Sequence, residues 1–297
     1  MRVPAKVNLA LAVGPLRPDG FHELATVYQA LSLYDVVELV ERTDGRGPVL
    51  SVAGRESATV PTGDGNLAWQ AAVLAAKAFE RAPDLGITID KGIPVAGGMA
   101  GGSADAAAVL RGVAQLWQID SEAELMEVAT QLGSDVPFAL LGGTAVGAGR
   151  GEVVTSAMGS GTFHWVLALS DGQLSTPAVY RALDGLRGDP ADAPSPTLAP
   201  EVLLAVRTGD AKALGAALSN DLQPAAFALM PPLQMLLELG PEHGALGSIV
   251  SGSGPTCAFL VEDEDAALEL AVALSASGLC RAVRRAVGPV PGATVVE

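Results

Sequence analysis

Apolar residues occupy every second position at the start of the chain: Val3, Ala5, Val7, Leu9, Leu11 and Val13. This period of two predicts a strand with one buried face. Lys6 and Asn8 then share the opposite, polar face. A lysine in such a place is usually only solvated, but its pairing with Asn8 makes this face a candidate binding surface.

The pattern further along the chain predicts a mixture of strands and helices. Apolar runs predict strands at 21–34, 36–41, 49–53, 87–90, 143–154, 163–170, 249–251, 256–261 and 281–287. Helical spacing predicts helices at 66–82, 103–117, 122–132, 201–206, 211–219, 233–239 and 264–277, the first capped by Asn66. The stretch 184–200 is rich in Asp, Pro and Gly, which predicts a loop.

Strands cluster first and then mix with helices, without the regular βαβ alternation of a doubly wound sheet. This order predicts an α+β fold. Glycines punctuate residues 147–151 and 159–161 and suggest a domain boundary near residues 150–162. We therefore expect two domains, residues 1–155 and 156–297.

Composition and charge narrow the classes of function. The chain has 297 residues, 49% of them hydrophobic, and its net charge is −15. This apolar content excludes a disordered polyelectrolyte, and the acidity argues against a nucleic-acid partner, which would need a basic surface. No apolar run approaches the roughly 18 residues of a membrane span, and Cys257 and Cys280 form no C-x-x-C pair. We expect a cytoplasmic protein with no membrane partner.

The strongest chemical signal is a glycine-rich segment at residues 94–106, with sequence PVAGGMAGGSADA. Glycines let the backbone approach a ligand closely, and the segment leads into a predicted helix that Ser103 would cap. Free amides at a helix start suit phosphate. The spacing fits neither G-x-x-x-x-G-K-[ST] nor G-x-G-x-x-G. A mobile capped loop without ligand is the structural alternative.

Two further segments combine turn residues with chemistry. In Gly133–Phe138, Asp135 is either a simple helix cap or a carboxylate base at a helix end. Residues 251–256, with sequence SGSGPT, form either a tight turn or a backbone contact to an anion. His22 and His164 are more typical of structural histidines, and no His, Cys or Asp cluster has metal-site spacing.

Together these segments resemble the three signature motifs of the GHMP kinases: Pro4–Leu9, the 94–104 loop and Ser251–Thr256. Within the family, the chain is similar to the branch that acts on a cytidine diphosphate-linked methylerythritol. The residues that carry this likeness are Asp19–His22, Asn66-Leu67, Leu132–Pro137 and Thr176-Pro177. They span nearly the whole chain in the family's order.

The resemblance implies a two-domain fold, with a ribosomal S5 domain 2-like N-terminal domain and a ferredoxin-like C-terminal domain. It also implies ATP-dependent phosphorylation of the 2-hydroxyl of that substrate, with ATP and Mg²⁺ as cofactors, in the non-mevalonate isoprenoid route. Asp135 matches the catalytic base, and Lys6 matches the lysine that positions it and steadies the phosphoryl group. The Mg²⁺ ligands and the oligomeric state, monomer or weak homodimer, stay open.

The resemblance also assigns the binding residues. ATP would contact Asn66, Leu67, Lys91, Pro94, Val95, Ala96, Gly97, Gly98, Met99, Ala100, Gly101, Gly102, Ser103 and Ala104. Substrate would contact Asn8, Phe21, His22, Thr176, Tyr180, Gly252, Ser253 and Gly254, with cytosine stacked between Phe21 and Tyr180 and His22 at its edge.

The chain departs from the family pattern in three places. Phe21 stands where many members have Tyr, so a ring remains without its hydroxyl, and Ala96 and Ala104 replace a Gly and a Ser. Ser103 is then the main side-chain donor of the loop. Two alternatives remain: a family member acting on homoserine, mevalonate or a sugar, and a nucleotide-binding module without catalysis. The first would not need the aromatic set, and the second would need neither Lys6 nor Asp135.

Overall fold

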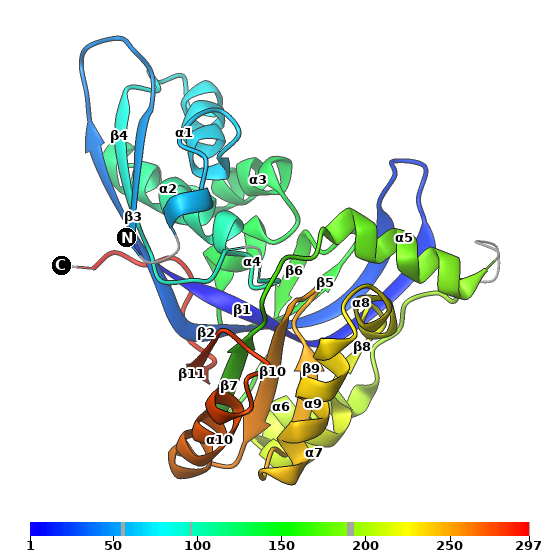
Figure 1. The fold of residues 1–297 in the computed structure, drawn as a ribbon. Coiled ribbons are helices and arrows are strands. Elements are labelled where there is room, and N and C mark those ends of the chain that lie inside the picture. Colours follow the sequence, from blue (N-terminus) through cyan, green and yellow to red (C-terminus); the bar gives the residue numbers. More distant parts are fainter. Residues whose placement is uncertain (55–56, 96, 189–192, 297) are drawn as a thin grey trace.

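The computed structural model describes residues 1–54, 57–95, 97–188 and 193–296. It confirms the α+β expectation, with two sheets and helices packed on them (Figure 1). The larger sheet runs β3-β4-β2-β1-β8, and β5 pairs with both β2 and β6. Its strands are β1 (Arg2–Leu16), β2 (His22–Glu41), β3 (Val49–Gly54), β4 (Leu85–Lys91), β5 (Thr144–Ala148), β6 (Val153–Ser156) and β8 (Ser219–Asn220).

Helices of the N-terminal half cover one face of this sheet (Figure 1). They are the short 3-10 helix η1 (Ser57–Thr59) and the α-helices α1 (Leu67–Ala78), α2 (Gly101–Trp117), α3 (Glu122–Leu132) and α4 (Val136–Leu141). The Asn66 side chain caps α1 by accepting from the Ala68 amide, as predicted. Helix α2 is rich in alanine, so it packs closely against both α1 and β2.

The second sheet is antiparallel, in the order β11-β7-β10-β9. Its strands are β7 (Phe163–Leu169), β9 (Gly247–Val250), β10 (Thr256–Val261) and β11 (Ala282–Gly288). The helices of this half are α5 (Thr176–Arg187), α6 (Pro200–Thr208), α7 (Ala211–Ala217), α8 (Gln223–Leu229), α9 (Pro232–Glu242) and α10 (Glu264–Ala276). No helix within the described ranges has the length and apolar character needed to cross a bilayer.

The first strand is buried on both faces, so the expectation of a half-buried strand was wrong. Lys6 and Asn8 lie on the face opposite Val7, yet both are buried. Strand β1 lies inside the sheet, between β2 and β8, and α2 packs against it. The polar pair therefore lies within the protein and not on an exposed face of the sheet.

Several predicted boundaries differ from the structure. Residues 22–41 form a single strand, whereas 143–154 divides into β5 and β6 at a glycine turn. Helices α5 and α8 were not predicted, and the expected loop at 184–200 begins with the last turn of α5. Helix α2 begins two residues before Ser103, with Ala100 at its cap position and no side-chain cap.

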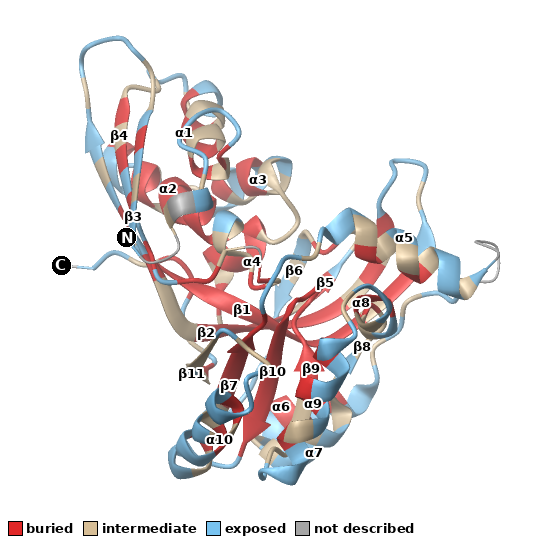
Figure 2. Ribbon diagram, viewed as in Figure 1, coloured by how far each residue is buried: buried red, intermediate tan, exposed pale blue. Residues whose placement is uncertain are grey.

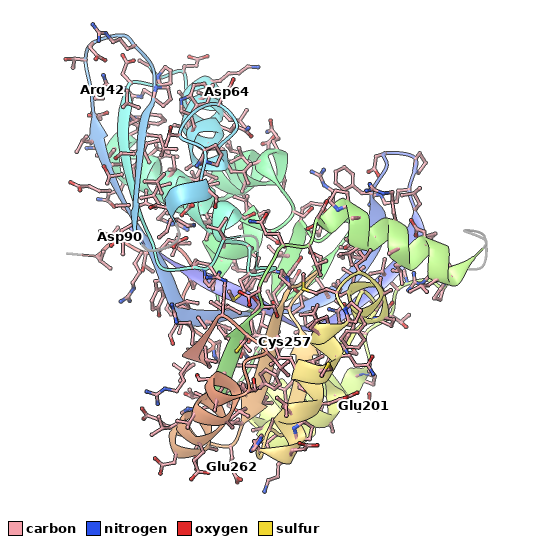
Figure 3. The ribbon with its side chains drawn as sticks, in the orientation of Figure 1. Arg42, Asp64, Asp90, Glu201, Cys257 and Glu262 are labelled. Atoms are coloured by element: carbon pink, nitrogen blue, oxygen red, sulfur yellow. The ribbon has the colours of Figure 1, made fainter. Side chains whose placement is uncertain are left out.

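The two halves of the chain are joined by more than a linker. Strand β8, from the second half, pairs in parallel with β1, and Thr294 and Pro291 form bridges with Arg2 and Gly142. Figure 2 shows the buried residues running continuously through the region where the sheets meet. Cys257 lies in this interior on β10, whereas Asp64, Asp90, Glu201 and Glu262 lie toward the periphery (Figure 3).

Candidate functional site

A cavity of about 820 Å³ lies between the two halves of the molecule. The N-terminal half supplies β1, the start of β2, the glycine-rich segment and the loop before α4. The C-terminal half supplies one face of α5 and the turn at Gly252 and Ser253. A cavity with walls from both halves can hold two reactants side by side.

The glycine-rich segment forms one end of this cavity. Ala100 has a left-handed backbone, with φ of 59°, and α2 starts directly after it. The amides of Gly101 and Gly102 therefore belong to the first turn of a helix, where they have no partner within the helix. Such amides and the positive end of the helix dipole bind phosphate, without requiring a lysine in the loop.

The turn at residues 251–254 packs directly on this segment. The Ser251 hydroxyl donates to the Gly98 carbonyl over 3.1 Å. Gly98 has φ of +72°, and a Cβ there would lie 2.1 Å from the Ser251 carbonyl oxygen. Gly252 lies beside Lys6, because a Cβ added at Gly252 would lie 3.2 Å from Lys6 Nζ. The two glycine motifs are thus one contact surface beside Lys6.

Lys6 is held by a chain of buried hydrogen bonds. Its Nζ donates to Asn8 Oδ1 over 2.6 Å, and Asn8 Nδ2 donates to Thr26 Oγ1 over 2.8 Å. The Thr26 hydroxyl in turn donates to the Ala10 carbonyl over 2.7 Å. Lys6, Asn8 and Thr26 each donate one hydrogen bond to the next group in this chain. The chain holds the ammonium group of Lys6 in a fixed position in the cavity wall.

The carboxylate of Asp135 lies 3.9 Å from Lys6 Nζ. Asp135 occupies the cap position of α4, but its side chain makes no hydrogen bond to the helix amides. The alternative that Asp135 serves only as a helix cap is therefore wrong. Burial and the nearby charge of Asp135 raise the pKa of Tyr28 well above its ordinary value, so that this phenol stays protonated. A partly exposed carboxylate beside a lysine and a phenol is well placed to take a proton from a bound hydroxyl.

Aromatic residues line the opposite end of the cavity. His22 and Tyr180 stack with ring centroids 5.0 Å apart and an interplanar angle of 29°. Phe21 is 47% exposed, and the Arg150 guanidinium lies 4.9 Å from its ring centroid. His22 Nε2 lies 2.9 Å from Asp184 Oδ1, and Thr176 Oγ1 lies 2.9 Å from Ser253 Oγ.

Most of the residues that the sequence assigned to the site line this one cavity: Lys6, Asn8, Phe21, His22, Asn66, Leu67, Lys91, Pro94, Val95, Gly97, Gly98, Ala100, Gly101, Gly102, Asp135, Thr176, Tyr180, Gly252 and Ser253. Met99, Ser103, Ala104 and Gly254 do not form part of its wall. Ala96 lies outside the described residues. Ser103 neither caps α2 nor lines the cavity, because the helix begins before it.

Lys91 is already engaged with two carboxylates. Its Nζ lies 2.5 Å from Asp35 Oδ2 and 2.8 Å from Asp105 Oδ2, and all three side chains are buried. Burial raises the pKa of Asp105 to about 8, despite the attraction of Lys91. The ammonium charge of Lys91 is thus neutralised inside the protein, which leaves less of it for a nucleotide.

Sequence reasoning did not identify several residues of the wall, notably Tyr28, Asp105, Arg150, Arg181 and Asp184. Asp184 follows Tyr180 by one helical turn on α5. The sequence does contain signals for that helix. Ser175 is a residue typical of a helix cap, Pro177 is typical of a first turn, and the apolar Val179 and Leu183 are one turn apart. The nearby Asp, Gly and Pro residues outweighed them in the sequence pattern.

Among the described residues, no group of three His, Cys, Asp or Glu side chains is placed to hold a metal ion. This does not conflict with Mg²⁺, which usually keeps several waters and binds substrate phosphates with only one or two protein oxygens. Ser134 lines the cavity beside Asp135, and its hydroxyl is an oxygen that fits such an ion.

Comparison with known proteins agrees with this geometry. Residues 66–143 match the GHMP kinases N terminal domain, and residues 202–279 match the GHMP kinases C terminal domain. The chain is 55% identical to a 4-diphosphocytidyl-2-C-methyl-D-erythritol kinase of Rhodococcus jostii (strain RHA1), over 100% of this chain and 94% of the relative. It is 56% identical to the enzyme of that name from Thermobifida fusca (strain YX), over 100% and 97%.

Solved structures give the same result. The crystal structure of a 4-(cytidine 5'-diphospho)-2C-methyl-D-erythritol kinase superposes with a TM-score of 0.75 at 33% identity, covering 97% of this chain and 98% of that one. A homoserine kinase from Cytophaga hutchinsonii shares the fold, with a TM-score of 0.74 at 16% identity over 98% and 95% of the two chains. The chain therefore belongs to the GHMP kinases, and within them to the 4-diphosphocytidyl-2-C-methyl-D-erythritol kinase family.

Proposed function

We propose that the chain transfers the γ-phosphoryl group of ATP to the 2-hydroxyl of 4-diphosphocytidyl-2-C-methyl-D-erythritol. The products are the 2-phosphate and ADP, on the non-mevalonate route to isopentenyl diphosphate and dimethylallyl diphosphate. The observation that carries this proposal is the Lys6–Asp135 pair, 3.9 Å apart. It lies in a cavity with phosphate-binding amides at one end and aromatic rings at the other.

The chemistry follows from this arrangement. Asp135 accepts the proton of the 2-hydroxyl as its oxygen forms a bond to the γ-phosphorus. The bond from that phosphorus to the bridging β,γ-oxygen breaks, and ADP leaves. Lys6 and the first amides of α2 stabilise the charge on the transferring group, while Mg²⁺, when bound, neutralises the phosphates.

The remaining contacts divide the cavity between the two substrates. Asn66 and Leu67 border the nucleoside of ATP, but both polar groups of the Asn66 side chain are taken by the Ala68 amide and the Pro61 carbonyl. The Asn66 side chain therefore contributes to the shape of the site more than to hydrogen bonds with the adenine base. We further propose that the enzyme works in the cytoplasm as a monomer or weak homodimer without a nucleic-acid partner, in keeping with its net charge of −15.

The test is Asp135→Asn, measured by coupled ADP release with the cytidine substrate, mevalonate and homoserine as acceptors. We expect turnover with the cytidine substrate alone, and a loss of about two to four decades in kcat for the variant. The dissociation constant of ATP should stay within about twofold, because the amides of α2 are unchanged.

Asp120→Asn is the matched control, since Asp120 is exposed between α2 and α3. Near-normal turnover in Asp135→Asn would refute the role of this carboxylate as base. Turnover of mevalonate or homoserine in place of the cytidine substrate would refute the proposed acceptor. ATP binding without turnover of any acceptor would favour a nucleotide-binding module.

A further inference from the structure

Helix α5 presents one face to the aromatic end of the cavity. Thr176, Tyr180 and Asp184 follow one another at four-residue spacing, and all three line the cavity. Residues at this spacing lie on one side of a helix. The face therefore brings a hydroxyl, a ring and a carboxylate to the same wall.

Two residues of this face fix the imidazole of His22. Asp184 Oδ1 lies 2.9 Å from His22 Nε2, and the ring of Tyr180 stacks on the imidazole. The side chain of His22 is only 6% exposed, whereas that of Asp184 is 39% exposed. His22 is thus held in place, while Asp184 still reaches the open part of the cavity.

The bond to Asp184 determines which nitrogen of His22 carries a proton. An ionised carboxylate can only accept hydrogen bonds, so Nε2 must be the donor. In the neutral ring Nδ1 is then an acceptor. Among the described residues Nδ1 has no hydrogen-bond partner.

We propose that Asp184 is a positioning residue that makes this end of the cavity selective for a base with an amino group, as cytosine has. By keeping the proton of His22 on Nε2, it leaves acceptors facing the base: Nδ1 of His22 and the second carboxylate oxygen of Asp184. The 4-amino group of cytosine donates to such acceptors, whereas O4 of uracil would face them without a proton. This inference rests on the proposed function for the identity of the substrate.

The first experiment measures binding without catalysis. Isothermal titration with cytidine diphosphate and uridine diphosphate compares the wild type with Asp184→Asn and Asp184→Ala. We expect the wild type to prefer cytidine diphosphate by about tenfold or more, because a mismatched base leaves polar groups unpaired. In both variants the preference should fall to within about twofold, and Asp171→Asn, an exposed control before α5, should keep it.

The second experiment observes the tautomer directly. The ¹⁵N spectrum of histidine-labelled wild type should show His22 protonated at Nε2, and Asp184→Asn should show a mixture, because an amide can also donate. Asp184→Glu, which keeps a carboxylate, should restore part of the base preference. With the proposed acceptor, kcat and the KM of ATP should change less than about twofold in Asp184→Asn, while the acceptor KM rises.

These results separate the two proposals. A base preference that survives both Asp184→Asn and Asp184→Ala, or a wild-type His22 protonated at Nδ1, would overturn the role of Asp184. If the wild type prefers cytidine diphosphate but fails to phosphorylate the cytidine substrate, the proposed reaction is wrong and the base preference stands.

Discussion

The ammonium group of Lys6 is buried and held by one hydrogen bond, to Asn8. Its hydrogen-bond chain through Asn8 and Thr26 ends on the backbone of β1 itself. The position of the ammonium group thus depends on the strand and not on the solvent. Tyr28 adds to this wall, because its ring lies 5.7 Å from Lys6 Nζ and stacks on Phe138.

The buried group of Asp35, Lys91 and Asp105 makes stability depend on pH. The pKa of Asp105 is raised to about 8 in the folded chain, from an ordinary value of 3.8. Between these values the folded chain holds a proton that the unfolded chain has lost, so the stabilisation is complete below pH 3.8 and lost as pH rises through 8. The free energy of unfolding should therefore decrease from pH 6 to pH 9.

Asp105→Asn should remove this decrease. We expect the wild-type Tm to fall between pH 6 and pH 9 by at least about 2 °C more than that of the variant. Thermal unfolding followed by circular dichroism measures this, with Asp90→Asn as control because Asp90 is exposed on the same strand as Lys91. Parallel curves for wild type and Asp105→Asn would contradict the assignment.

At the scale of the element, α5 is attached to the N-terminal half at two points. Asp184 contacts His22, and near its end Arg187 donates to the Val13 carbonyl over 2.6 Å and to Asp221 over 2.9 Å. Asp221 also accepts from the Val13 amide. Arg187 is therefore a link between α5, β1 and the segment after β8.

Loss of this link should affect one substrate more than the other. We expect Arg187→Ala to lower the free energy of unfolding by about 1–3 kcal/mol, because the partners keep unpaired polar groups. The acceptor KM should rise several-fold while the KM of ATP is unchanged. Steady-state kinetics and urea unfolding measure both effects, with Arg207→Ala on α6 as control. An equal rise in both KM values would show that α5 does not act on the acceptor end alone.

Sequence pattern predicted the elements whose signals are local. The glycine-rich segment, Asp135 before its short helix and the cap at Asn66 could all be located, because each depends on neighbouring residues. Burial of both faces of β1 could not be predicted, since it depends on β8 and α2, which are distant in the chain. The Asp184–His22 contact was missed for the same reason: 162 residues separate the partners.

At the scale of the whole molecule, the two halves share one hydrophobic core. A single core cluster contains Val3 and Leu31 of the first half together with Trp165, Leu167 and Val202 of the second. The tail around Thr294 returns to β1. The domain boundary at residues 155 and 156 stays a prediction.

Differential scanning calorimetry should consequently show one cooperative transition for the full chain. The fragment 1–155 should lack a sharp transition, because it would expose the core face that Trp165 and its neighbours cover. Two well-separated transitions in the full chain, or a cooperatively folding fragment, would show that the halves are independent.

The packing of Gly98 against Ser251 constrains how this kind of enzyme can be recombined. A Cβ at Gly98 would lie 2.1 Å from the Ser251 carbonyl oxygen of the other half. No larger residue can replace Gly98 unless the turn at Ser251 also moves. In a chimera that takes its acceptor-binding half from another kinase of the family, the turn of that half must fit against Gly98 of the retained half. A change of acceptor preference can therefore involve residues of α5, whereas Gly98 and the turn at 251–254 must keep the backbone geometry that lets them pack together.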